Sequence, residues 1–193
     1  MRKPAGILIG LLVLILFGSC QQNSERTDSY FDSLVAAQVA HLSKVKASLV
    51  KKATLDGKED QSSFIPDSIT WENELGIFRQ LSVFERPAYR NAYRVEDGMK
   101  DGRSNLIIRR YQTTQKIPVP ELRFYYFSQF RNLKKIEATY RQQNLLYTTI
   151  RHLSMEFEEV QGEQFLIAYR IDGEQKMFLG DSVKFSIRSE IVN

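Results

Sequence analysis

The chain has 193 residues, of which 26% are charged, with 27 lysines and arginines against 23 aspartates and glutamates. This length suits a single globular domain, and the small net charge by itself says little about partners. Because Cys20 is the only cysteine, an intrachain disulfide is excluded. Stability must come from a buried core, and a chain of this length can bury about 70% of its unfolded surface.

The N-terminal residues have the order of an export signal. Two basic residues precede an uncharged apolar run over residues 5–17, which is followed by small residues at 18–19. A transmembrane helix, the first alternative, needs about 20 apolar residues, and Gln21 ends this run too early. Cleavage by ordinary signal peptidase, the second alternative, would leave Cys20 as an unpaired thiol in a secreted chain.

The end of the apolar run resembles a known processing motif. Residues 16–20 (LFGSC) resemble a lipobox, at which the lipoprotein signal peptidase of bacteria cuts before a cysteine that becomes diacylated. The sequence departs from the family pattern in one respect, because Phe17 and not Leu16 stands three places before Cys20.

This resemblance implies a division of the chain and a location. Residues 1–19 would be removed, Cys20 would carry the lipid that holds the protein in the membrane, and residues 20–28 would form a polar tether. Two acyl chains make such an anchor stable, whereas one gives only marginal binding. Gln21 stands where an inner-membrane retention signal has aspartate, which favours the outer membrane of the cell envelope.

The remaining sequence predicts one α+β domain over residues 29–193. A cap at Asp28 or Ser29 starts a helix whose apolar stripe includes Phe31 and Leu42 and also contains Gln38, which would need a partner. Residues 47–64 predict an edge hairpin with its turn at 56–57. Two further helical segments are expected, at 69–80 and 86–90.

From residue 92 onward the sequence predicts strands. Short linkers favour an antiparallel meander, so the predicted fold is N-terminal helices packed on a curved, mostly antiparallel sheet. The turns include Asp97-Gly98 and Asp172-Gly173. Residues 133–159 could also be helical. The expected strands are 92–96, 105–113, 121–128, 133–141, 145–157, 164–172, 175–179 and 183–191.

Charge is distributed unevenly along these strands. Residues 100–151 carry eleven lysines and arginines against three acids, and residues 152–193 carry eight acids against four bases. One interpretation is that opposite charges pair across neighbouring strands. The other is a basic face for an anionic partner, such as lipid head groups or an acidic glycan. The candidate ligand-facing residues are Arg109, Arg123, Tyr125, Phe127 and Arg151.

Aromatic residues occur on most of the predicted strands. Alternating aromatics most often form core or cross-strand pairs, which is the first interpretation. The second is a concave aromatic face for a lipid, a peptide or a glycan, by analogy with the half-barrels that carry lipids across the periplasm.

Catalytic and nucleic-acid motifs are missing from the sequence. The two histidines, His41 and His152, lie far apart, and no HExxH, GxSxG, SxxK or glycine-rich phosphate loop occurs. We therefore expect no metal, no cofactor, no enzymatic activity and no nucleic-acid partner. A hydrolase, the most distant alternative, would need a cleft that joins a histidine to a carboxylate.

Several stretches together resemble a family of uncharacterised Bacteroidota lipoproteins. They are residues 71–75 (WENEL), 86–89 (RPAY), 144–147 (NLLY) and 169–175 (YRIDGEQ). The resemblance implies an envelope lipoprotein without a known activity. Two functions follow as hypotheses: a non-enzymatic module that binds an anionic or amphipathic envelope ligand, and a scaffold lipoprotein that docks on an envelope protein through a flat apolar patch.

Overall fold

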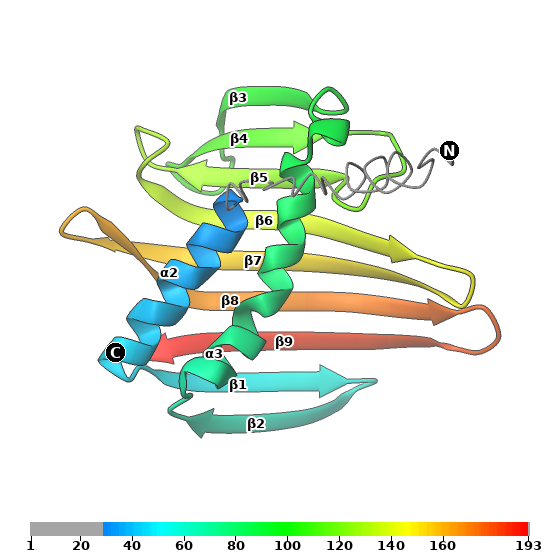
Figure 1. Cartoon of the computed structure of the whole chain (residues 1–193), viewed down its shortest axis with the longest axis horizontal. Helices are drawn as coiled ribbons and strands as arrows, with labels where there is room; N and C mark the ends of the chain where they lie inside the picture. Colours follow the sequence, from blue (N-terminus) through cyan, green and yellow to red (C-terminus); the bar gives the residue numbers. More distant parts are fainter. Residues whose placement is uncertain (1–28, 193) are drawn as a thin grey trace, which may run out of the picture.

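The computed structural model describes residues 29–192, so the predicted signal peptide, the tether and Cys20 lie outside the described part. It contains a nine-stranded open sheet with the strand order β2-β1-β9-β8-β7-β6-β5-β4-β3, in which every neighbouring pair is antiparallel. The helices lie on one face of this sheet (Figure 1). The predicted α+β class is confirmed.

Helix α2 (Tyr30–Val45) begins where the capping pattern predicts. The Ser29 hydroxyl accepts a hydrogen bond from the Asp32 backbone at 3.1 Å and caps the first turn. Phe31, Val35 and Leu42 of the predicted apolar stripe are fully buried, whereas Val45 at the end of the helix is 44% exposed. The helix ends at Lys46, whose left-handed backbone closes the last turn.

The next elements also follow the sequence pattern, with one change of geometry. Strands β1 (Ser48–Leu55) and β2 (Lys58–Phe64) form the predicted hairpin, whose turn residues Asp56 and Gly57 both have positive φ. Asp67 caps α3 (Ser68–Leu75), after which the chain continues as the 3-10 helices η1 (Gly76–Glu85) and η2 (Pro87–Tyr89). The predicted helix at 69–80 is therefore α-helical only in its first half.

The rest of the chain forms seven strands. Residues 133–159 lie in two of these strands and the turn between them, so the helical alternative is wrong. The strands are β3 (Arg94–Lys100), β4 (Ile107–Gln112), β5 (Glu121–Tyr126), β6 (Leu133–Gln143), β7 (Tyr147–Val160), β8 (Glu163–Met177) and β9 (Ser182–Val192).

Two predicted turns are wrong, because both Asp-Gly pairs lie inside strands. Asp97 and Gly98 form a bulge in β3, where the Asp97 carboxylate accepts a hydrogen bond from Arg109 Nε at 2.9 Å. Gly173 lies within β8, opposite Phe185 of β9. A Cβ on Gly173 would stand 2.2 Å from the Phe185 ring, so the ring occupies the place of a side chain.

The core lies between the helical layer and one face of the sheet. Trp71, Phe78 and Leu75 from the helical segments are fully buried, as is Leu166 of β8, and the Tyr169 ring packs edge-on against Phe78 at 5.9 Å. A second aromatic group continues this core under η1 and the start of α2. Its rings are Tyr30, Phe31, Phe84, Tyr93, Tyr111, Phe124 and Phe130.

These contacts favour the core interpretation of the aromatic residues. Most of their rings fill the space between the helices and the sheet, where a concave lipid-binding face would otherwise have to form. The opposite face of the sheet is therefore the one that is open to a partner.

Candidate functional site

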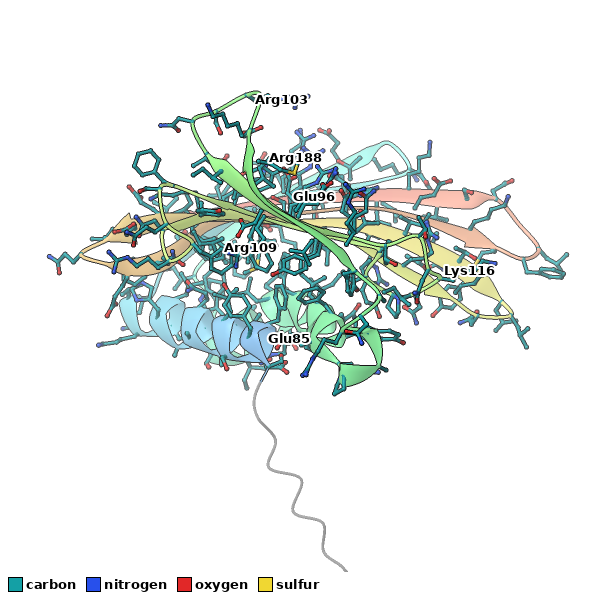
Figure 2. All side chains as sticks on the ribbon, turned by 90° about the horizontal axis from the view of Figure 1, so that it is seen from above. Glu85, Glu96, Arg103, Arg109, Lys116 and Arg188 are labelled. Atoms are coloured by element: carbon teal, nitrogen blue, oxygen red, sulfur yellow. The ribbon has the colours of Figure 1, made fainter. Side chains whose placement is uncertain are left out.

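One face of the sheet is not covered by helices. Side chains alternate between the two faces along each strand. In β5, Phe124 packs against Phe31 of α2, whereas its neighbours Arg123 and Tyr125 point to the uncovered face. Figure 2 shows the helices on one side of the sheet and Arg188 and Glu96 on the other.

Strand register places eight residues of the uncovered face in one line across the sheet, which we call the cross-strand row. Each is paired with the next by antiparallel register, and five of the eight are basic. In order from β1 to β3 they are Lys52, Arg188, Arg170, Ser154, Glu137, Arg123, Arg110 and Glu96.

The row contains like charges directly opposite one another. Lys52 faces Arg188, Arg188 faces Arg170, and Arg123 faces Arg110. Such pairs destabilise a sheet. Ion pairs reduce the repulsion at Lys52, which meets Glu59 at 2.8 Å, and at Arg170, which meets Asp172. Among the described residues, Arg188 has no ion-pair partner within 4.0 Å.

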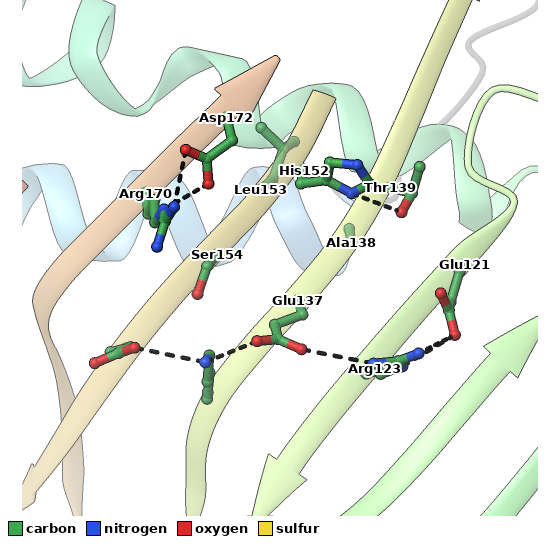
Figure 3. Close-up of a pocket in the computed structure, with 12 residues that line it drawn as sticks. Glu121, Arg123, Glu137, Ala138, Thr139, His152, Leu153, Ser154, Arg170 and Asp172 are labelled. Carbon is green, nitrogen blue, oxygen red and sulfur yellow. Dashed lines mark hydrogen bonds and ion pairs between the residues drawn. The ribbon is translucent and has the colours of Figure 1, made fainter. Parts of the chain in front are cut away.

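The centre of the row lies in a depression of about 380 Å³ (Figure 3). A chain of ion pairs crosses it. Arg123 contacts Glu121 at 2.6 Å and Glu137 at 3.9 Å, and Lys135 contacts Glu137 at 2.7 Å and Glu156 at 3.7 Å. Each cation thus faces two carboxylates, which fixes its position without excluding water.

Glu137 is the acceptor at the centre of this chain. Burial acts to raise the pKa of Glu137, but hydrogen bonds from Lys135 and Tyr125 outweigh it, so the pKa lies below its ordinary value. Tyr125 donates its hydroxyl to Glu137 at 2.6 Å. Burial and this bond raise the pKa of Tyr125 to about 12, so the phenol remains protonated at neutral pH.

A second depression of about 600 Å³ adjoins the first and shares Arg123, Lys135, Glu137 and Glu156 with it. Its lining includes apolar groups, namely Ile108, Tyr125 and Ile167, and further cations, namely Arg103 and Lys134. Among the described residues, neither Arg103 nor Lys134 has an ion-pair partner within 4.0 Å. The two depressions together form a groove that is charged at one end and partly apolar at the other.

His152 lies in the first depression with the carboxylates of Glu137 and Asp172, an arrangement that the hydrolase alternative requires. Its Nδ1 is 3.3 Å from the Thr139 hydroxyl. Asp172 instead accepts hydrogen bonds from Arg170 and Ser186. Within residues 29–192 no hydrogen bond joins His152 to a carboxylate, so this part of the chain lacks the oriented base of a hydrolytic triad.

Of the predicted ligand-facing residues, Arg123 and Tyr125 come together in the groove. The structure does not bring the other three to it. Arg109 lies on the helix side, paired with Asp97 and 4.3 Å from the Phe130 ring. Arg151 also faces the helices and donates a hydrogen bond to Gln80 of η1 at 3.2 Å. Phe127 follows the end of β5 and is exposed.

The predicted basic segment is partly neutralised. Four of its eleven cations form ion pairs among the described residues, namely Arg109, Arg110, Arg123 and Lys135. Within residues 29–192, the pair of Lys135 with Glu156 is the one ion pair that joins this segment to the acidic C-terminal one. Pairing across neighbouring strands therefore accounts for part of the charge pattern.

Sequence reasoning missed the basic residues at the other end of the row, Lys52, Arg170 and Arg188. Arg170 and Arg188 lie in the segment 152–193, whose overall charge is acidic, and Lys52 lies outside both segments in which charge is uneven. The signal that could have found Arg170 is local, because it lies between the buried residues Tyr169 and Ile171 and so must point away from the core.

Comparisons with protein-family models, with curated proteins and with solved structures found no match to this chain. Within residues 29–192, no helix combines the length and apolarity needed to cross a bilayer. In the same residues, no group of three or more histidine, cysteine or acidic side chains is placed to hold a metal ion.

Proposed function

We propose that this protein is a non-enzymatic, lipid-anchored binding module of the bacterial cell envelope, and that it holds an elongated anionic ligand along the cross-strand row. The observation that supports the proposal is the placement of five cations in one line on the sheet face that the helices leave open; four of them also form ion pairs, and Arg188 has no ion-pair partner among the described residues. Like charges opposite one another reduce stability, and an anion bound between them would remove that cost.

The spacing of the row indicates what kind of ligand fits. Neighbouring strands lie about 4.8 Å apart, so Lys52, Arg188 and Arg170 follow one another at that interval. Arg123 is three strands beyond Arg170, or about 14 Å. A ligand with several separated negative charges, such as an acidic glycan or a cluster of phosphorylated head groups, matches this spacing.

The second depression supports an amphipathic ligand in particular. Ile108 and Ile167 line it beside Tyr125, and so do Arg103 and Lys134, which have no ion-pair partner within 4.0 Å in the described part of the chain, together with one acid, Asp101. A phosphate or carboxylate could lie against these cations while an apolar part of the same ligand covers the isoleucines.

The proposal is tested by removing cations from the row without changing the core. Arg170→Gln with Arg188→Gln should weaken binding of a heparin octasaccharide about tenfold, because each lost contact contributes roughly 0.7 kcal/mol. The matched control is Arg86→Gln with Arg90→Gln, which removes the same charge from exposed positions around η2. Isothermal titration calorimetry at low and high salt measures both variants.

The expected result includes a change in stability. The row variant should keep or gain thermal stability, since it removes a like-charge pair, while its affinity falls. Equal losses of affinity in both double variants would indicate a nonspecific charge effect and overturn the proposal. Dodecyl phosphate is a second probe, which distinguishes an amphipathic ligand from a purely anionic one. If the ligand is amphipathic, Ile108→Ser in the second depression should also weaken the binding of dodecyl phosphate.

The anchor is tested separately by the intact mass of protein purified from its own membranes. Wild type should begin at a diacylated Cys20, and Cys20→Ser should be neither cleaved at that position nor acylated. An unmodified cysteine in the wild type would overturn the envelope location while leaving the binding site open to test.

A further inference from the structure

Two hairpin turns lie side by side at one end of the sheet. The turn between β6 and β7 and the turn between β8 and β9 are joined by a hydrogen bond from the Phe178 backbone to the Leu146 carbonyl at 2.8 Å. In Figure 1 both turns extend past the helical layer, which covers the other part of the sheet. The two turns therefore form one projecting unit.

This unit exposes four large apolar side chains, which we call the apolar tip. Leu145 is 92% exposed, Leu146 68%, Phe178 79% and Leu179 86%. Single exposed apolar residues are ordinary on a protein surface, but four on two adjoining turns mark an interaction site. The Asn144 side chain accepts hydrogen bonds from the Leu146 and Tyr147 backbones at 2.8 and 2.9 Å, which holds the first turn in shape.

The charges around the tip fit a bilayer surface. Residues 143–147 and 177–180 contain no ionisable side chain that is charged at neutral pH, so little desolvation opposes their burial in lipid. The second turn ends with the exposed residue Asp181, and the nearest charged residues along the adjoining strands β6, β7 and β8 are Arg141, Arg151 and Lys176, so the balance around the tip is positive. A projecting apolar tip with cations at its base matches the polarity of the bilayer interface.

We propose that the apolar tip inserts into the interfacial region of the membrane that carries the lipid anchor, so that the domain contacts the bilayer at two points. This proposal rests in part on the proposed function, because its next argument needs the lipid anchor at Cys20. Residues 20–28 span at most about 30 Å when extended, so an acylated Cys20 confines the domain to the membrane surface. Because the anchored domain stays this close to the bilayer, even a weak apolar contact between the tip and the lipid forms in a substantial fraction of the molecules.

A fluorescent label at the tip tests this contact in the mature, acylated protein. With Cys20 acylated, Phe178→Cys introduces the only free thiol, which can carry an environment-sensitive nitrobenzoxadiazole group. The protein is reconstituted into vesicles of equal parts phosphatidylethanolamine and phosphatidylglycerol. We expect brighter, blue-shifted emission from position 178, and quenching by a nitroxide placed in the acyl chains.

Two controls separate insertion from other causes. Glu159→Cys places the same label at the opposite end of β7 and should give neither the blue shift nor the quenching. Leu145→Ser with Leu179→Ser, added to Phe178→Cys, should abolish the signal without unfolding the protein, because both leucines are exposed.

Three results would overturn the proposal. The first is an unchanged emission at position 178, and the second is an equal change at positions 178 and 159. The third is a change in emission that depends on protein concentration in detergent without vesicles, because this would indicate contact between two copies of the chain. A wild-type protein that takes up the label would show instead that Cys20 is not acylated, so failure of the anchor is distinguished from failure of the tip.

Discussion

Gln38 shows how one polar residue connects the two layers of the protein. It lies on the apolar side of α2 and is only 4% exposed. Its amide nitrogen donates to the Gln164 carbonyl at 2.9 Å, and its amide oxygen accepts from the Leu166 backbone at 2.8 Å. These bonds satisfy two backbone groups of β8 and fix the position of the helix on the sheet.

Replacement of this side chain should be costly. Gln38→Ala leaves the Leu166 N–H and the Gln164 carbonyl without partners, and we expect it to lower the free energy of unfolding by about 1–3 kcal/mol. Urea denaturation followed by circular dichroism measures the loss. Gln61→Ala on the exposed strand β2 is the control and should change stability by less than about 0.5 kcal/mol. Equal effects at the two positions would contradict the role of Gln38.

Glu137 should make stability depend on pH. Its pKa in the folded protein lies below the ordinary value of 4.5, so the ionised side chain stabilises the fold above that pH, and the contribution is lost as the pH falls through the folded pKa. Glu137→Gln should therefore flatten the fall in stability below pH 4.5, as measured by urea unfolding at a series of pH values. A slope identical to that of the wild type would contradict this assignment.

At the scale of elements, local pattern predicted most of the helices and strands. The Ser29 cap, the stripe of α2 and the 56–57 turn depend on residues close together in the chain. The two Asp-Gly pairs at 97–98 and 172–173 are predicted as turns from the sequence. The same residue types also occur in β-bulges, as at Gly98, and in strands where a neighbouring side chain lies over a glycine, as at Gly173. Only the partner strands distinguish these outcomes.

Gly173 permits a direct test of this distinction. In wild type, Gly173→Ala should destabilise the protein by about 1–3 kcal/mol, because the new methyl group meets the Phe185 ring. In the background of Phe185→Ala the same change should be neutral or stabilising, since alanine reduces the conformational entropy of the unfolded chain relative to glycine. Urea unfolding of the four proteins gives the coupling energy between the two sites. Additive effects would contradict the contact.

At the scale of the whole molecule, the first strands depend on the last one. Strands β3 to β9 follow one another as the predicted meander, but β1 pairs with β9 and carries β2 at the edge. This pairing joins residues more than a hundred positions apart, and no local signal in the sequence reports it. It also brings Lys52 next to Arg188 and so completes the cross-strand row.

Removal of β9 should therefore disrupt more than one strand. A chain that ends at Gly180 leaves the β1–β2 hairpin without its neighbour and exposes the edge of β8, so we expect loss of the cooperative unfolding transition in urea. A chain that lacks only Asn193 keeps every strand pair and serves as the control. A cooperative transition in the shorter chain would show that β1 and β2 are held by the helices alone.

Short stretches of sequence are enough to show the lipobox resemblance and to predict the capped first helix and the alternation of the strands, because these features depend on residues that are close together in the chain. Of the five residues that the sequence suggested as candidates for ligand binding, Arg123 and Tyr125 line the groove. The three-dimensional arrangement was needed to show that Arg109 and Arg151 face the helices and that β1 pairs with β9. It was also needed to place Lys52, Arg188, Arg170 and Arg123 in one row. The physical reason is that strand register and the covered face are set by packing between distant segments, which local periodicity does not encode.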